Sequence, residues 1–324
     1  MTAYFTNYRI SLKRGEMSKI KLWLKAIRAP FFTATIVPVI LGSIIAWYAT
    51  HTFNWFYFGL TLLGIVLCHT GTNLANDYFD HTSQNDWVNK TPTPFSGGSR
   101  MIQNKLIPPR QILIVSLLAF IFGAVIGLYL NYVTGGKVIL GLGIIGTALG
   151  FFYTASPLRI GYRGFGLGEF AVGLGFGPLV VLGAYFVQAQ RLDWLPLWAS
   201  IPVGILIALV LYINEFPDYE ADKAVNKRTL PVVLGKKAAA LLYYILITLT
   251  YLWIIGGVII KVFPAMALLT LLTLPIALKA VKTLAKNYDG VYNLLPANAA
   301  TIMLHLSFGI ILSLGFLLHK IIGG

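Results

Sequence analysis

Residues 194–222 read WLPLWASIPVGILIALVLYINEFPDYEAD, and this stretch decides the class of fold. Its first 20 residues carry no charged side chain. An α-helix needs about that length to cross the hydrocarbon core of a bilayer. The stretch then becomes polar, with four carboxylates among residues 214–222. We therefore predict a membrane-spanning helix whose last turns carry a cluster of acidic side chains.

The rest of the chain has the same character. Of its 324 residues, 57% are apolar and 11% are charged, whereas about a quarter of a soluble domain is charged. We predict an all-α integral membrane protein with nine transmembrane helices, because eight further stretches are long and apolar enough to span. The nine predicted spans are residues 31–50, 55–74, 112–130, 138–154, 166–188, 194–216, 238–260, 263–281 and 298–318.

The basic residues indicate the orientation, because loops rich in Lys and Arg stay in the cytosol. With a cytosolic N-terminus, 21 of the 25 basic residues lie on the cytosolic side. The exceptions are Lys137, Arg191, Lys261 and Lys320. We expect residues 1–27 to form a cytosolic N-terminal segment and residues 28–324 a single multi-pass domain in the cell membrane. Anionic headgroups of the lipid bilayer then account for the net charge of +14, and no nucleic-acid partner is expected.

A second acidic cluster follows the second predicted span, where residues 73–86 read NLANDYFDHTSQND. In both clusters an asparagine precedes an aspartate by four residues, a spacing that stacks two side chains on one face of a helix. The pairs are Asn76 with Asp80 and Asn214 with Asp218. Both clusters begin at the end of an even-numbered span, so we predict that they share the cytosolic side.

The donor atoms of these clusters indicate a metal. Stacked carboxylates near a bilayer are costly unless they are paired or bound to a cation. Carboxylate and amide oxygens without a nearby His or Cys pattern suit Mg²⁺, which completes its coordination with phosphate oxygens of a substrate. Solvated helix ends are the alternative, and Asp77 fits either a ligand or a partner of a ligand. The candidate metal ligands are Asn76, Asp77, Asp80, Asp86, Asn214, Asp218 and Asp222.

With these motifs the chain resembles the UbiA superfamily of intramembrane prenyltransferases. Further segments resemble the branch that prenylates 1,4-dihydroxy-2-naphthoate in menaquinone synthesis. They are PFSGGSR (94–100), YTASPLR (153–159), GYRGFGLGE (161–169) and DYEADKAVNKRTLPVVLG (218–235). The resemblance runs from about residue 28 to the end of the ninth span. It implies nine helices around a central cavity, a magnesium-bound diphosphate beneath cytosolic loops, and a lateral opening to lipid.

The predicted site has a donor half and an acceptor half. An allylic diphosphate leaves readily when metal ions and fixed cations neutralise its charge. We therefore expect Asp80 and Asp218 to be catalytic through the metal. Arg100, Lys227 and Arg228 are candidate diphosphate ligands, because Arg and Lys match phosphate. Contact with lipid headgroups is the alternative for these three cations.

For the acceptor half, Tyr153 and Arg159 lie at the cytosolic end of the fourth predicted span. Arg159 suits the carboxylate of a ring acceptor, and the face of Tyr153 suits an allylic cation. Tyrosines at the membrane interface are also common as simple anchors.

The resemblance implies magnesium-dependent transfer of a polyprenyl group from its diphosphate to an aromatic acceptor. The branch implies 1,4-dihydroxy-2-naphthoate as that acceptor and a demethylmenaquinone as product. The alternatives are prenyl transfer to 4-hydroxybenzoate, haem, chlorophyllide or a glycerol phosphate lipid. From another class, a transporter remains an alternative, although transporter charges lie near the midplane and these lie at one mouth.

Overall fold

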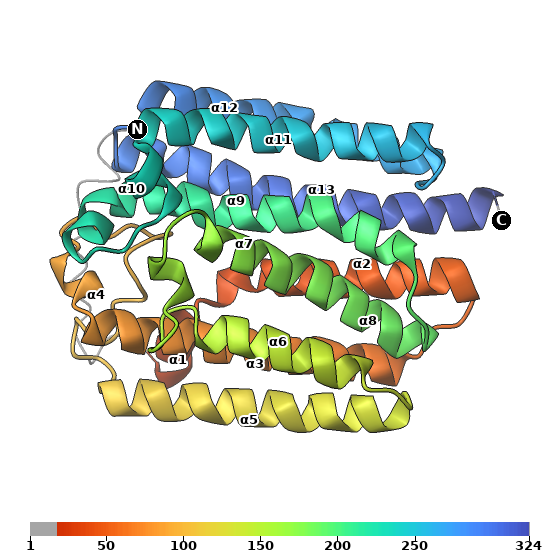
Figure 1. Ribbon diagram of the computed structural model, residues 1–324, viewed down its shortest axis with the longest axis horizontal. Coiled ribbons are helices and arrows are strands. Elements are labelled where there is room, and N and C mark those ends of the chain that lie inside the picture. Colours follow the sequence, from red (N-terminus) through yellow and green to blue (C-terminus); the bar gives the residue numbers. More distant parts are fainter. Residues whose placement is uncertain (1–17, 324) are drawn as a thin grey trace.

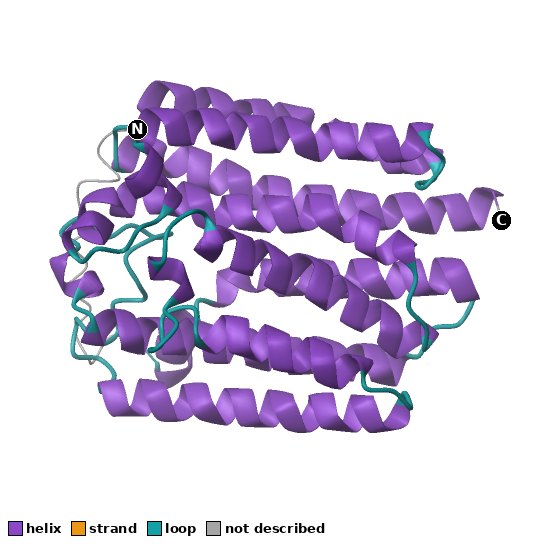
Figure 2. Cartoon of the chain, viewed as in Figure 1, coloured by secondary structure: helices purple, strands orange, loops and turns teal. Residues whose placement is uncertain are grey.

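The computed structural model describes residues 18–323, and over that range every regular element is a helix (Figure 2). The long helices lie side by side along the longest axis of the molecule (Figure 1). They are α2 (Thr33–Thr50), α3 (Trp55–Thr82), α5 (Pro109–Val133), α6 (Val138–Phe151), α9 (Trp194–Ala224), α11 (Lys236–Ile259), α12 (Leu274–Asn287) and α13 (Leu295–Gly323). The shorter α-helices are α1 (Lys19–Ala26), α4 (Asn85–Val88), α7 (Leu167–Leu174), α8 (Val180–Ala189) and α10 (Leu230–Leu234).

Eight helical segments in the described part of the chain are long and apolar enough to cross a membrane. The protein is therefore a multi-pass membrane protein. The fourth predicted span differs from expectation, because α6 has 14 residues and ends at Phe151. At 1.5 Å per residue it is about 21 Å long, which is less than the roughly 30 Å of a hydrocarbon core. Residues 152–158, which the sequence placed partly in that span, form turns instead.

The two predicted spans that end in the acidic clusters continue as helix for eight residues beyond their predicted ends. The second reaches Thr82 within α3, and the sixth reaches Ala224 within α9. Each acidic cluster is thus largely part of the helix that precedes it, so the four-residue Asn–Asp spacing does place the two side chains on one helical face. Pro217 lies inside α9 without ending it.

The fifth predicted span is one helix, Leu167–Ala189, with a π-helical turn in its middle. Between α7 and α8 lies a π-helical turn, η4 (Gly175–Leu179), which contains Pro178. Close packing explains Gly177, because a Cβ atom there would lie 2.5 Å from the Cα atom of Gly204 in α9. Glycine at this position therefore allows the span to approach α9 more closely than a residue with a side chain would permit.

The packing leaves the site at one end of the bundle. The largest buried apolar cluster joins α2 and α9 to α11 and α13, whereas α3, α5 and α6 lie on the other side of α2 and α8 (Figure 1). The segments after α3, α6 and α9 gather with α4 and α10 at the left end of Figure 1. Of the predicted N-terminal segment, residues 1–17 lie outside the described residues, and the remainder contains α1.

Candidate active site

A cavity of about 760 Å³ lies inside the bundle and is walled by α3, α5, α6, α9 and the α7–α8 span. One end is polar and carries side chains of both acidic clusters. The rest is walled mainly by apolar residues and glycines. The cluster residues that line it are Asn76, Asp80, Asp86, Asn214, Asp218 and Asp222.

The first cluster is held by hydrogen bonds to Asp80. The hydroxyl of Tyr162 donates to Asp80 Oδ1 at 2.6 Å, and Asn76 Nδ2 donates to Asp80 Oδ2 at 3.1 Å. Asp86 lies in α4, which follows a turn at Gln84 with a φ of 67°. Gly98 passes so close to it that a Cβ atom there would lie 2.3 Å from Asp86 Oδ2. Only glycine fits at that position, where φ is also +75°.

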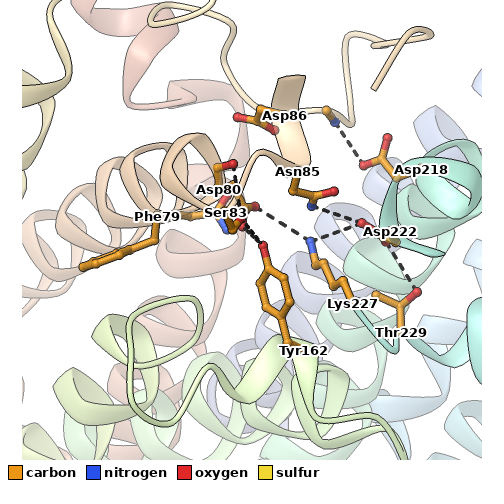
Figure 3. Close-up of polar contacts among 12 residues, drawn as sticks. Phe79, Asp80, Ser83, Asn85, Asp86, Tyr162, Asp218, Asp222, Lys227 and Thr229 are labelled. Carbon is orange, nitrogen blue, oxygen red and sulfur yellow. Dashed lines mark hydrogen bonds and ion pairs between the residues drawn. The ribbon is translucent and has the colours of Figure 1, made fainter. Parts of the chain in front are cut away.

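The second cluster is tied to the segment that follows α3, so the two clusters face each other (Figure 3). Asp218 accepts a hydrogen bond from Asn89 Nδ2 at 2.8 Å and another from the backbone N–H of Gly97 at 3.0 Å. Asp222 accepts one from Asn85 Nδ2 at 3.2 Å. These bonds join residues more than 120 positions apart. They hold the segment that follows α3 against the end of α9.

Lys227 lies between the clusters (Figure 3). Its Nζ atom is 3.5 Å from Asp222 Oδ1 and 3.8 Å from Asp80 Oδ2. Burial alone would lower the pKa of Lys227, but the carboxylates of Asp222 and Asp80 raise it well above its usual value. Burial, together with the charges of Asp80 and Asp77, raises the pKa of Asp86. The polar end thus holds more negative charge than Lys227 neutralises, which favours a bound cation.

The residues present fit magnesium shared with a substrate rather than a cage made by protein alone. Among residues 18–323, no group of three or more His, Cys, Asp or Glu side chains is arranged to hold a metal ion. The donors are nevertheless hard oxygens, and within the same range the buried Oδ1 atom of Asn85 has no hydrogen-bond partner. Mg²⁺ commonly uses one or two carboxylates and completes its coordination with phosphate oxygens and water.

Of the twelve site residues predicted from the sequence, eight line this cavity and four do not. Tyr153 and Lys227 join the six cluster residues in the lining. The four outside it are Asp77, Arg100, Arg159 and Arg228.

Asp77 does not line the cavity, and its contacts are with other parts of the protein. It forms an ion pair with Arg28. It also accepts a hydrogen bond from the backbone N–H of Ser99 at 3.1 Å and another from the Ser99 hydroxyl. These contacts tie the start of α2 and the 94–100 segment to α3. They fit the alternative prediction for Asp77, a residue that supports the metal ligands rather than one that binds the metal.

The three arginines also lie outside the cavity lining, and each has another partner. The guanidinium of Arg100 donates to the backbone carbonyl of Asp86 and so holds α4. The Arg159 guanidinium lies 3.9 Å from the ring centroid of Tyr162, and that of Arg228 lies 5.5 Å from the ring of Phe165. Arg159 therefore contacts Tyr162, and Tyr162 in turn donates a hydrogen bond to Asp80.

Sequence reasoning missed several residues that the fold brings to the site. Asn85, near the end of the first cluster, and Asn89, just after it, could have been found from the sequence, because they repeat the four-residue spacing. Tyr162 had no such signal, because it comes from the segment after α6 and meets Asp80 only in the fold. Glu215 lies beside Asn214 in the cavity wall, is 5% exposed, and has an Oε2 atom without a partner among the described residues.

A helical membrane bundle whose cavity ends in two facing Asn–Asp clusters is the architecture implied by the resemblance to intramembrane prenyltransferases. Comparison with known proteins confirms that class. The model of the UbiA prenyltransferase family matches residues 35–316, and the chain belongs to this family. It is a prenyl-transferring enzyme.

The similar proteins cover nearly the whole chain. It is 28% identical over 306 residues to the 1,4-dihydroxy-2-naphthoate octaprenyltransferase of Bacillus subtilis, covering 94% of both chains. It is 29% identical over 297 residues to the 2-carboxy-1,4-naphthoquinone phytyltransferase of Synechocystis, covering 91% of this chain and 93% of the other. In fold it is similar to a UbiA homologue from Archaeoglobus fulgidus, with a TM-score of 0.63 at 16% identity over 90% of this chain and 99% of the other.

Proposed function

We propose that this enzyme transfers a polyprenyl group from polyprenyl diphosphate to 1,4-dihydroxy-2-naphthoate in a magnesium-dependent reaction, which gives a demethylmenaquinone. One observation carries the proposal: a single cavity joins two facing carboxylate clusters to long apolar walls. The names of the Bacillus and Synechocystis relatives support a naphthoate-type acceptor. The Archaeoglobus homologue was solved with dimethylallyl diphosphate (DMAPP) and Mg²⁺, which supports a metal-bound diphosphate.

The polar end would bind the diphosphate. Bound Mg²⁺ would supply neutralisation of the charge that develops on the departing diphosphate. Lys227 is the cavity-lining cation between the clusters, so its ammonium donates to the diphosphate oxygens. The residues that would hold the metal are Asn76, Asp80, Asp86, Asn214, Asp218 and Asp222.

The apolar walls would bind the prenyl chain and exclude water from the reacting carbon. Tyr153 lines the cavity where the polar end meets the apolar part, and its side chain is 8% exposed. Gly161 packs against its ring, since a Cβ atom there would lie 2.8 Å from a ring atom. A ring held in this way presents its face to an allylic cation. The ring acceptor then forms a carbon–carbon bond to the prenyl group and loses its carboxyl group as carbon dioxide.

A product assay tests the acceptor. The purified enzyme is incubated with Mg²⁺, a labelled polyprenyl diphosphate and either 1,4-dihydroxy-2-naphthoate or 4-hydroxybenzoate. We expect a prenylated naphthoquinone after oxidation, with carbon dioxide released in equal amount, because the electron-rich fused ring traps the cation. Prenylation of 4-hydroxybenzoate with no reaction of the naphthoate would refute this acceptor and leave prenyl transfer intact.

The proposal includes nine membrane crossings, with the N-terminus and the site on the cytosolic side. The short helix α6 would make the ninth crossing, because it carries the chain between the end of α5 and the start of α7, which lie at opposite ends of the bundle (Figure 1). The excess of basic residues on one side supports the orientation.

Cysteine labelling tests this orientation. Lys223 and Arg191 are both exposed and lie near opposite ends of the bundle. In a Cys68→Ser background, an impermeant thiol reagent should label Lys223→Cys only from the cytosolic side and Arg191→Cys only from the other side. The opposite pattern would invert the proposed topology.

A further inference from the structure

The helix α6 presents a row of glycines to the cavity. Gly143, Gly146 and Gly150 are spaced by three and four residues, so they share one face of the helix. This face points inward, because a Cβ atom at Gly150 would lie 2.4 Å from Thr72 Oγ1 in α3. All three glycines line the cavity.

Two of these glycines border open space rather than a neighbouring helix. A Cβ atom at Gly143 would meet no atom within 4 Å, and one at Gly146 would meet only Leu179 Cδ1, at 3.9 Å. The contrast is Gly42, where a Cβ atom would lie 2.3 Å from a backbone oxygen of Val181. Helix packing requires glycine at Gly42 but not at Gly143 or Gly146. Glycine in a helix interior is destabilising relative to alanine, so close packing does not explain these two positions.

The cavity walls opposite α6 also contain glycines whose Cβ positions border open space. Gly127 in α5 lines the cavity and has no atom within 4 Å of a Cβ position, and Gly183 in α8 has only Leu142 Cδ1, at 3.7 Å. Three helices thus contribute glycines to one stretch of the apolar wall. The volume of this stretch exists because side chains are missing there.

Polar atoms without a hydrogen-bond partner are independent evidence that the same cavity binds a ligand. Asn85 and Glu215 line its polar end, are at least 94% buried, and each have an oxygen without a partner among the described residues. A ligand that satisfies these oxygens at its polar head must extend its apolar part along the remaining walls. At 1.5 Å per residue along α6, Gly146 lies about 7.5 Å and Gly143 about 12 Å from the end of the helix at Phe151.

We infer that Gly143 and Gly146 determine the longest prenyl chain that the enzyme accepts. The inference rests on the proposed binding of the donor, with its diphosphate at the carboxylates and its chain along α6. A linear hydrocarbon needs a continuous channel free of side chains, and a side chain on α6 would end that channel at a defined depth. The two glycines are therefore specificity-determining residues for the donor, at two different depths.

The experiment places a leucine at each depth. Gly143→Leu and Gly146→Leu are assayed for kcat/KM with geranyl, farnesyl, geranylgeranyl and longer diphosphates at a fixed acceptor concentration. Gly143→Leu should lower kcat/KM for the longer donors by at least about tenfold, and change that for geranyl diphosphate by less than about twofold, because misfit of a few methylenes costs this much in an apolar pocket. Gly146→Leu should move the loss to shorter donors. Leucine has a higher helix propensity than glycine, which favours folding of both variants.

Gly141→Leu is the matched control. Gly141 lies in the same helix two residues from Gly143 and, like Gly143, is exposed and has no atom within 4 Å of a Cβ position, but it does not line the cavity. This variant should keep the donor preference of the wild type.

The outcomes separate the inference from the proposed function. Unchanged donor preference in Gly143→Leu, or an equal loss with every donor, would overturn the inference while prenyl transfer by the wild type stands. Absence of transfer by the wild type with every donor and acceptor would refute the proposed function and the inference with it.

Discussion

Removal of divalent cations with EDTA should abolish turnover, and added Mg²⁺ should restore it. Five carboxylates line one end of the cavity, and Lys227 lies between the two clusters. They are those of Asp80, Asp86, Glu215, Asp218 and Asp222. Without metal this end repels a diphosphate and leaves its developing charge unneutralised. We expect a loss of at least about 10³-fold in kcat, the scale seen when a group that stabilises transition-state charge is removed.

The measurement is the initial rate of prenyl transfer against free Mg²⁺ concentration. EDTA saturated with Mg²⁺ before addition is the control, since it tests whether the chelator acts other than by binding metal. Mg²⁺ should also raise the midpoint of thermal unfolding, because it binds the folded carboxylate cluster and not the unfolded chain. Full turnover in metal-free buffer would show that the clusters are only solvated helix ends.

Asp218→Asn and Asp77→Ala should fail in different ways, although each removes a carboxylate, half-buried in Asp218 and buried in Asp77. Asp218→Asn keeps the shape of the side chain and an acceptor oxygen for the N–H of Gly97, but it removes a charge from the cavity wall. We expect a loss of about 10²- to 10³-fold in kcat with a folded protein. Asp77→Ala leaves Arg28 without its ion-pair partner. Because the Arg28 side chain is 25% exposed, we expect a cost of about 3 kcal/mol in the free energy of unfolding, the lower end of the range for a buried pair.

Activity and thermal unfolding in detergent, measured on the same preparations, separate the two effects. Glu220→Gln is the matched control for Asp218→Asn, since Glu220 lies on the same helix but is exposed and does not line the cavity. It should retain normal turnover. Wild-type turnover in Asp218→Asn would remove that carboxylate from the metal site, and a wild-type unfolding midpoint in Asp77→Ala would remove the structural role of the Arg28 pair.

The membrane fold and the two clusters were predictable because they are local properties of the sequence. Apolar length and the spacing of Asn214 and Asp218 depend only on the geometry of a single helix, and α9 has both. The fourth predicted span was the exception. Hydropathy continued to residue 154, but the helix ends at Phe151 and the chain turns there, which brings Tyr153 into the cavity wall.

The sequence by itself determined that this chain is a helical membrane protein and which helix ends carry hard oxygen ligands. Only the tertiary structure decided which of those groups meet. Asn89 reaches Asp218 across 129 positions, and Asp77 reaches Arg28 across 49. No helical period relates such residues. Whether a charge faces the cavity or supports its wall therefore depends on contacts between distant segments, which is why Lys227 lies between the clusters while Arg100 and Arg159 hold the surrounding structure.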